Sequence, residues 1–368
     1  MNKINNILIC PLEWGLGHAG RMIALARRLN DRGNRIFVGA GREHQALFRS
    51  ELPGLSYIDF PGFRPAYSRY LPQYLYLFLQ IPVLLFRIVS EHIALKSIIR
   101  DNRIDIVISD NRFGLWNKKI KTVYVTHQPL IPFPVRLKFL EFAGIMLHRQ
   151  AIKRYSLCFI PDLPGELNVS GRLSHGVRLP PNVRFIGILS RFTGSPFAEA
   201  AIRPDHPHNT IILSGPEPQK GILRARLVSL LKDRKPQTVI LEGRPGDPCN
   251  HAETGNILSI SHLPSAQMNR IISGSDMIIA RSGYTSVMEL ISLNCSALLV
   301  PTPGQTEQEY LARYLSEKGW FCTLPQNGLE IPFMPQMKLI PAAEIIERSN
   351  NLIEKALDEL LEQHERED

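Results

Sequence analysis

The feature that most constrains the fold of this chain is a turn of two small residues. It lies between a hydrophobic run and an amphipathic run. Residues 277–280 are predicted to form a buried strand, Ser282 and Gly283 a turn, and residues 284–293 a helix. The first N–H groups of a helix have no partner within it, and the helix dipole adds positive potential there. Together these features suit an anionic group such as a diphosphate. The segment therefore predicts an anion site between a strand and a helix.

The residues after this turn complete the pattern expected of a nucleotide-binding site. Glu289 lies about two turns into the predicted helix, where its carboxylate could accept hydrogen bonds from two ribose hydroxyls. A second hydrophobic run, residues 296–300, ends in the polar loop 303–308. A ribose partner and an anion site on one helix predict nucleotide binding.

The length and the alternation of elements predict two domains. The chain has 368 residues, and domains typically hold about 100 to 200. Strand-like runs alternate with helical runs over residues 7–126 and again over 210–324, which indicates β-α-β units and parallel sheets. A loop-rich zone with several prolines, residues 161–207, separates the two series. We predict an α/β protein with a Rossmann-like domain over 1–190, a second over 191–345 and a C-terminal helix over 346–368 that docks on the first domain.

The end of the first predicted strand carries a glycine-rich loop with a histidine inside it. Gly15, Gly17 and Gly20 fit the G-x-G-x-x-G pattern of dinucleotide-binding loops. The acidic residue expected after the second strand is missing, and Arg42 there leaves an NADP-dependent reductase open. His18 would face a cleft at a helix N-terminus, where a neutral imidazole could remove a proton; it could also serve only the turn.

Other strand ends carry further candidates, because ligands gather at the carboxyl ends of parallel strands. Asp110 could orient a histidine or cap a helix. His127 and Gln128 follow another buried strand, and Ser214 and Gly215 follow the first strand of the second series. Each of these positions could bind a ligand or serve only the local structure.

The charge of the chain favours anionic partners. The formal net charge is +9 and the pI is about 9.4. The basic residues are scattered and no nucleic-acid-binding module accompanies them, so we expect phosphorylated small molecules or lipid headgroups and no nucleic acid. Five widely spaced cysteines without a C-x-x-C pair indicate a reducing compartment. No secretory signal is evident at the N-terminus, and we expect a cytoplasmic protein.

One apolar stretch raises the question of a membrane. Residues 70–86 contain no charged side chain, but the stretch is short for a span and contains two prolines and two glutamines. Arg64, Arg69 and Arg87 flank it. The segment is predicted either to pack within its domain or to lie at a membrane interface.

Three motifs together carry a family resemblance. The segments 15–18, 281–289 and 305–308 resemble those of the GT-B glycosyltransferases, and of the family 28 group in particular. The resemblance implies two Rossmann-like domains facing a central cleft and an inverting transfer from a nucleoside-diphosphate sugar. It also implies UDP as the donor nucleotide, no metal, no cofactor besides the sugar donor, and acceptors that are often lipids at the inner face of the cell membrane.

The resemblance and the strand-end pattern assign roles to twelve residues. The catalytic residues are predicted to be His18 as general base and Asp110. The donor site is predicted to comprise Gly17, Ser214, Gly215, Ser282, Gly283, Glu289, Gln305 and Gln308. His127 and Gln128 are predicted on the acceptor side. A nucleotide-sugar epimerase of the same fold and a non-catalytic protein that binds nucleotide sugars or lipids remain alternatives.

Overall fold

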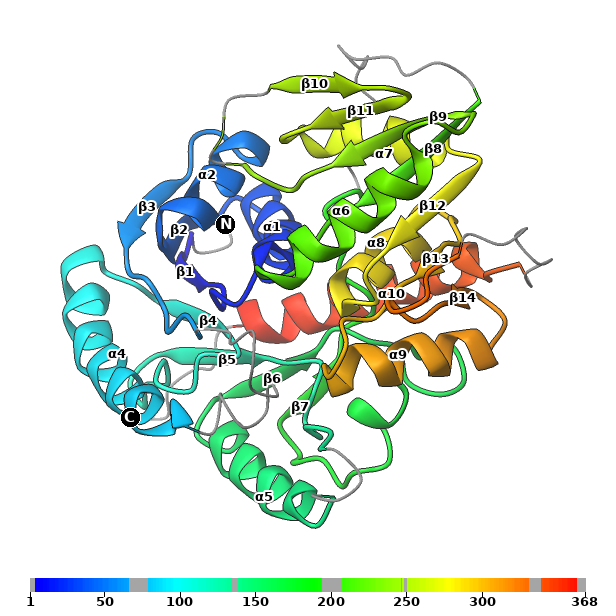
Figure 1. The fold of residues 1–368 in the computed structure, drawn as a ribbon. Helices are drawn as coiled ribbons and strands as arrows, with labels where there is room; N and C mark the ends of the chain where they lie inside the picture. Colours follow the sequence, from blue (N-terminus) through cyan, green and yellow to red (C-terminus); the bar gives the residue numbers. More distant parts are fainter. Residues whose placement is uncertain are drawn as a thin grey trace.

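Two parallel-rich sheets, each covered by helices on both faces, make up the protein (Figure 1). The computed structural model describes residues 4–65, 79–133, 138–193, 207–245, 247, 250–330 and 339–362. Of the apolar stretch predicted at 70–86, residues 70–78 lie outside these ranges. The α/β class and the two Rossmann-like halves predicted from the alternation of elements are confirmed.

The N-terminal sheet is parallel throughout, with strand order β3-β2-β1-β4-β5-β6-β7. Buried aliphatic residues fill the central strands, as expected when helices cover both faces of a sheet. The strands are β1 (Asn6–Cys10), β2 (Arg35–Ala40), β3 (Ser56–Asp59), β4 (Ile106–Asp110), β5 (Lys121–Val125), β6 (Leu157–Ile160) and β7 (Val183–Phe185).

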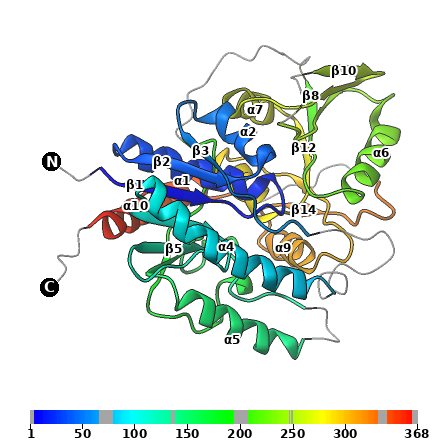
Figure 2. The same ribbon diagram turned by 90° about the vertical axis from the view of Figure 1, so that its left-hand side faces the viewer.

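Different helices cover the two faces of this sheet. Helices α1 (Leu16–Asp31) and α2 (Arg42–Glu51) pack on one face, and α4 (Ile81–Asn102) and α5 (Leu140–Ile152) pack on the other. Figure 2 shows α4 and α5 together on one side of the sheet. Each helix follows the carboxyl end of a strand and returns to the start of the next, so its N-terminus lies at the carboxyl edge.

The C-terminal sheet has the order β10-β11-β9-β8-β12-β13-β14, and only the pairing of β10 with β11 is antiparallel within the described residues. Helices α7, α8 and α9 pack on one face and α6 on the other. The strands are β8 (His208–Ile212), β9 (Gln237–Leu241), β10 (His251–Thr254), β11 (Ile257–Ile260), β12 (Met277–Ala280), β13 (Leu298–Leu299) and β14 (Cys322–Thr323). The helices are α6 (Gln219–Leu231), α7 (Ser265–Ser273), α8 (Tyr284–Ser292) and α9 (Thr306–Glu317).

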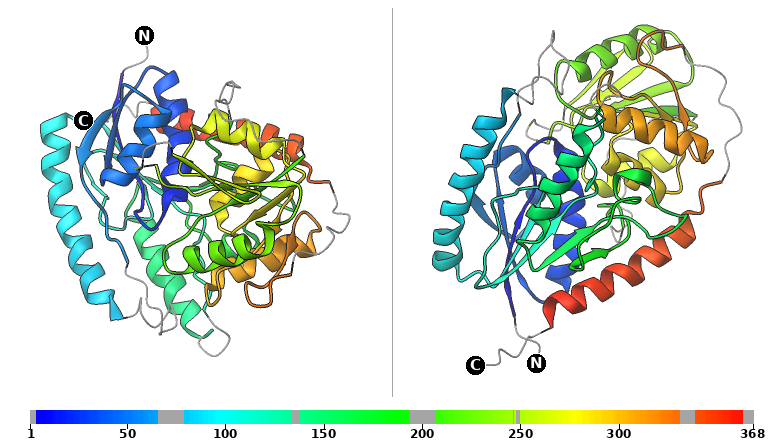
Figure 3. Two further views of the ribbon diagram at one scale, coloured as in Figure 1. Left: turned by 45° about the horizontal axis from the view of Figure 1, so that its top comes forward. Right: turned by 90° about the horizontal axis from the view of Figure 1, so that it is seen from below.

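The last helix connects the two halves. Helix α10 (Ala342–Leu361) begins against the C-terminal core and ends against the N-terminal core, where Ile353 and Leu357 are buried (Figure 3). Arg28 of α1 and Arg32, the residue after α1, pair with Glu354 of this helix. The domain limits at residues 190 and 345 stay predictions.

The strand order places a topological switch point in each sheet. The chain reverses direction across the sheet between β1 and β4 in the N-terminal half, and between β8 and β12 in the C-terminal half. Ligands of open α/β sheets bind beyond the carboxyl ends of the strands at such points. His18 and Asp110 lie at the first switch point, and Ser214 and Ser282 lie at the second.

The packing of α10 yields a stability prediction. Leu357→Ala should lower the free energy of unfolding by about 2–5 kcal/mol, because Leu357 is fully buried in the N-terminal core. Urea denaturation would measure the change. Lys355→Ala, at an exposed position on the same helix, is the control and should have little effect. Equal stability of both variants would contradict the docking of α10.

Candidate active site

A buried cluster of charged side chains joins α1 to the end of β4. His18 Nδ1 lies 2.9 Å from Asp110 Oδ2, and Arg21 Nε donates to the same oxygen at 3.0 Å. A second Arg21 nitrogen donates to Asp110 Oδ1 in a close contact. Asp110 is completely buried, while the His18 side chain keeps 19% of its surface exposed. The structure thus brings the two predicted catalytic residues together and leaves the imidazole accessible.

The electrostatics of this cluster keep Asp110 ionised and His18 neutral. Burial alone would raise the pKa of the Asp110 carboxyl, but Arg21 and His18 outweigh it and lower that pKa to about 2. Burial lowers the pKa of His18, Arg21 lowers it further, and Asp110 opposes both without reversing the shift. At neutral pH the imidazole is therefore a base held by an ionised carboxylate.

His127 forms a contact between the two halves. Its Nδ1 lies 2.8 Å from an Arg21 guanidinium nitrogen, and its Nε2 lies 3.0 Å from Glu307 Oε1 at the start of α9. The ring also stacks on Tyr284 of α8, with centroids 4.4 Å apart and planes 6° from parallel. Both ring nitrogens thus have protein partners, and the acceptor-side role of His127 stays a prediction. Its neighbour Gln128 is half-buried, and its backbone N–H donates to Thr126 Oγ1.

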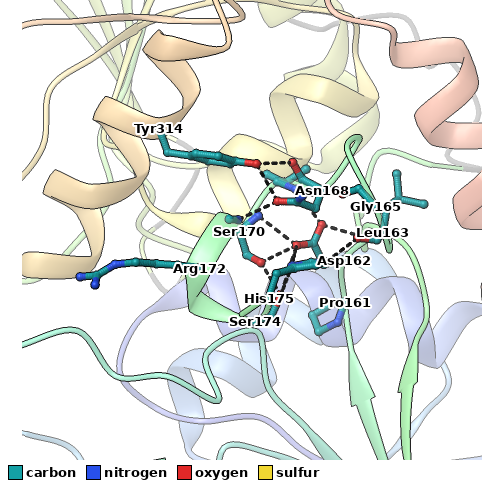
Figure 4. Close-up of polar contacts among 12 residues, drawn as sticks. Pro161, Asp162, Leu163, Gly165, Asn168, Ser170, Arg172, Ser174, His175 and Tyr314 are labelled. Carbon is teal, nitrogen blue, oxygen red and sulfur yellow. Dashed lines mark hydrogen bonds and ion pairs between the residues drawn. The ribbon is translucent and has the colours of Figure 1, made fainter. Parts of the chain in front are cut away.

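A loop after β6 holds α9 against the N-terminal half. The buried Asp162 carboxylate accepts N–H bonds from Leu163, Val169 and Ser170, which fixes the shape of the loop (Figure 4). Tyr314 of α9 then donates to the side-chain oxygen of Asn168 at 2.7 Å. Contacts at both ends of α9 therefore fix the helix that carries Glu307.

The turn before α8 has the form expected of an anion site. Gly283 is the N-cap residue in an extended conformation, and no side chain caps the helix. Ser282 is buried, and its hydroxyl donates to the carbonyl of Gln308 at 2.9 Å. The side chain of Ser282 thus holds the turn in place, while the N-terminal N–H groups of α8 remain the potential anion donors.

Glu289 lies two turns into α8, but an arginine already contacts it. Arg191 Nε donates to Glu289 Oε1 at 2.8 Å, and each side chain keeps 12% of its surface exposed. Burial raises the pKa of the Glu289 carboxyl, and Arg191 opposes this only in part. A ribose at this position would have to share the carboxylate with Arg191.

The two predicted glutamines lie at the start of α9. Gln305 is half-buried at the N-cap position, where its side chain can still be reached. Gln308 is buried, and its side-chain oxygen accepts the N–H of Thr302 at 2.9 Å. Gln308 therefore supports the loop between β13 and α9, and a contact of either glutamine with a sugar stays a prediction.

The loop after β8 lies beside this turn. Gly215 adopts a φ of +91° with open space where a Cβ would lie, and Ser214 is half-buried. Arg281, at the end of β12, donates to the carbonyl of Gln219 at 2.8 Å and to that of Val300 at 3.1 Å. The guanidinium thus joins the end of β12 to the start of α6 and to the residue after β13, around the predicted diphosphate position.

Three residues of this site were not predicted from the sequence. Arg21 follows His18 by three residues on the same helix, a spacing that places both side chains on one face and could have indicated their contact. Glu307 and Arg191 have partners more than 90 residues away, and no local pattern marks such pairs.

The described part of the chain contains no group of three or more His, Cys, Asp or Glu side chains arranged to hold a metal ion. Among the described helices, none combines the length and the apolar character that crossing a bilayer requires.

Comparison with known proteins shows the fold and the type of the C-terminal domain. Residues 246–339 match the glycosyltransferase family 28 C-terminal domain. The crystal structure of the glycosyltransferase SnogD from Streptomyces nogalater covers 97% of this chain and 96% of its own, with a TM-score of 0.57 and 15% sequence identity. The chain has the GT-B fold. This confirms the predicted fold class.

Two curated relatives extend the comparison of this GT-B protein. An uncharacterized glycosyltransferase from Methanosarcina mazei is 24% identical over 88% of this chain and 88% of its own. The Azoarcus UDP-N-acetylglucosamine–N-acetylmuramyl-(pentapeptide) pyrophosphoryl-undecaprenol N-acetylglucosamine transferase is 31% identical over 24% of this chain and 29% of its own length. The chain thus aligns with less than a third of the Azoarcus protein. The matches confirm the family 28 resemblance and support a glycosyltransferase.

The buried Asp110 carboxylate of this GT-B protein predicts a stability difference that depends on pH. Its folded pKa of about 2 lies below its ordinary value of 3.8, so its ionised form stabilises the fold above that ordinary value. At 1.36 kcal/mol per pKa unit, this form contributes about 2 kcal/mol to the free energy of unfolding. The contribution is lost as the pH falls toward 2.

Urea denaturation of wild type and Asp110→Asn between pH 5 and pH 2.5 would measure this. Wild type should be the more stable protein at pH 5, and the difference should shrink steadily toward pH 2.5. A difference that does not change with pH would show that Asp110 titrates at its ordinary pKa.

Proposed function

We propose that this protein is an inverting glycosyltransferase that moves a sugar from a nucleoside-diphosphate donor to an acceptor hydroxyl without a metal ion. The observation that carries the proposal is the His18–Asp110 pair, which lies across the interface from the N-terminus of α8. Gly17, next to His18, lies so close to Thr285 of α8 that a Cβ there would be 3.2 Å from the Thr285 side chain. A base and an anion site therefore lie on opposite sides of one interface.

The His18–Asp110 pair can take the proton of the acceptor hydroxyl. When the His18 ring proton is on Nδ1, it is donated to Asp110, and the lone pair of Nε2 is free to accept a proton. His18 Nε2 would take the proton of the acceptor hydroxyl as the hydroxyl oxygen bonds to the anomeric carbon. The bond from that carbon to the diphosphate oxygen breaks on the opposite side, and its electron pair leaves with the nucleoside diphosphate. One displacement inverts the anomeric configuration.

The C-terminal half would stabilise the leaving diphosphate. The N–H groups at the start of α8 and the loop at Ser214–Gly215 supply fixed dipoles, which stabilise developing negative charge without rearranging. Glu289 would bind the ribose. UDP is our proposed nucleotide because the Azoarcus relative is named for a UDP-N-acetylglucosamine donor.

The acceptor is proposed to be lipid-linked, at the cytoplasmic face of a membrane. Helices α4 and α5 cover the same face of the N-terminal sheet, and large apolar side chains are exposed along their first and middle turns and at Phe139 just before α5, toward the carboxyl edge of that sheet. These side chains, here called the apolar face, are Ile81, Val83, Leu85, Phe86, Val89, Ile93, Phe139, Phe142, Met146 and Leu147.

The net charge of the chain and the name of one relative support a lipid-linked acceptor at a membrane. Exposed apolar area of this kind marks interaction sites, and a net charge of +9 favours anionic lipids. The Azoarcus relative is named for a pyrophosphoryl-undecaprenol acceptor. Because the apolar face lies at the edge where His18 lies, a bound lipid headgroup would be near the base.

His18→Ala tests the catalytic role. Its turnover, measured as release of UDP from UDP-sugars in the presence of a membrane-lipid extract and EDTA, should fall by about 10²-fold or more. UDP affinity measured by calorimetry should stay close to wild type, because the donor site lies in the other half. His251→Ala, on the exposed edge strand β10, is the control and should match wild type. Full turnover in His18→Ala would rule out His18 as the general base. Turnover that requires magnesium would rule out metal independence.

Phe86→Glu combined with Phe142→Glu tests the apolar face. These side chains are 69% and 72% exposed, so the change should not disturb the core. The variant should sediment with vesicles of phosphatidylglycerol and phosphatidylcholine much less than wild type. Ile222→Glu, an exposed apolar position on α6, should bind like wild type. Equal binding by all three proteins would remove the apolar face from the proposal.

A further inference from the structure

Arg21 occupies the centre of the candidate site, although no step of the proposed reaction uses it. Its side chain is 1% exposed and is among the largest fully buried side chains of the described residues. It contacts both oxygens of Asp110, Nδ1 of His18 at 2.8 Å and Nδ1 of His127 at 2.8 Å. A single planar group therefore joins the carboxylate to both histidines.

The fork geometry of arginine explains why this position needs more than a positive charge. A guanidinium carries five N–H donors in fixed directions, and an ammonium group cannot reproduce a two-point contact with a carboxylate. Two Arg21 nitrogens bind the two oxygens of Asp110, which fixes the plane of that carboxylate. Since Asp110 Oδ2 faces His18 Nδ1, the orientation of the carboxylate decides how the imidazole is held.

Arg21 also competes for the same ring nitrogen. His18 Nδ1 can donate a proton to Asp110, or it can accept one from Arg21, but it cannot do both. The first arrangement leaves Nε2 free to act as a base, and the second places the proton on Nε2. The balance between Arg21 and Asp110 therefore determines whether His18 can accept a proton from a substrate.

The third contact of Arg21 connects this balance to the C-terminal half. An arginine only donates, so His127 Nδ1 accepts from Arg21 and the His127 proton lies on Nε2, directed at Glu307. Tyr284, the first residue of α8, stacks on the same ring. Two helices that begin beside the proposed donor site thus set the position of His127, and His127 contacts Arg21.

We propose that Arg21 is a positioning residue, which fixes the Asp110 carboxylate for His18 and aligns this pair with the C-terminal half through His127 and Glu307. The inference rests on the proposed function for its effect on turnover. Its effect on the His18 ring is a property of the free protein and can be measured without substrate.

The test is ¹⁵N-histidine NMR of the free protein across a pH titration, with wild type, Arg21→Met, Arg21→Lys and Arg28→Met. The charged groups facing His18 are Arg21 and Asp110, with His127 and Glu307 next to them. Removing the Arg21 charge should raise the His18 midpoint by about one pH unit or more, because Asp110 then acts on the ring unopposed. The neutral ring should be found mainly as the Nδ1–H form.

Two variants keep the test decisive. Arg21→Lys retains the charge without the fork, so it should fold if Arg21→Met does not, and its tautomer ratio at His18 should still differ from wild type. Arg28 lies two turns along the same helix and pairs with Glu354, so Arg28→Met should titrate like wild type. A His18 midpoint and tautomer ratio unchanged in both Arg21 variants would overturn the proposal.

A turnover measurement separates this inference from the proposed function. In the Arg21 variant that shifts the His18 midpoint, the acidic limb of the pH profile of kcat should move with that midpoint, while KM for a UDP-sugar changes little. A merely structural role would lower kcat equally at every pH and would contradict the inference. If His18→Ala retained full turnover, the proposed function would fail, but the NMR result on Arg21 would still stand.

Discussion

The close approach of α1 to α8 is the constraint on which the rest of the structure depends. A Cβ on Gly17 would lie 3.2 Å from the Thr285 side chain, and a Cβ on Gly20 would lie 3.2 Å from Glu289 Oε1. Both distances are tighter than ordinary van der Waals contact, so these positions favour glycine. The spacing of a dinucleotide-binding loop here serves the contact between two helices of different domains. Contact at this distance brings the proposed base of one half to the proposed anion site of the other.

Charge inside this interface follows from the same packing. Helices that approach so closely exclude water, and a buried ion is tolerated only when it is paired and hydrogen-bonded. Arg21 satisfies this condition through Asp110 and the two histidines, whereas Arg281 has only carbonyl partners among the described residues, and burial lowers its pKa to about 10. The N-terminal half thus neutralises its buried cation internally. The C-terminal half leaves a cation beside the loops of the proposed diphosphate site.

The sequence predicted the elements well and the contacts between the halves poorly. Periodicity and strand alternation identified both sheets, because each helix and strand buries one continuous apolar surface that a short window records. The contact of His18 with Asp110 follows from their places at the carboxyl ends of β1 and β4, which are neighbours in a parallel sheet. Their catalytic roles stay predictions. The pair His127–Glu307 depends on how two domains dock, and the pair Arg191–Glu289 joins the segment after β7 to α8 across 98 residues of sequence. Nothing within a short window encodes either contact. Gln308 was predicted to contact a sugar; its side-chain oxygen accepts a backbone N–H of the adjoining loop, and the sugar contact stays a prediction.

Two buried carboxylates with arginine partners show how environment separates their roles. The pKa of Asp110 falls to about 2, whereas that of Glu289 rises above its ordinary value. Asp110 accepts from two guanidinium nitrogens and faces His18, so the favourable contacts exceed the cost of burial. Glu289 has one contact with Arg191, and burial dominates. A carboxylate held by one arginine keeps acceptor capacity for the ribose that we propose there, while one held as firmly as Asp110 keeps its charge and orientation.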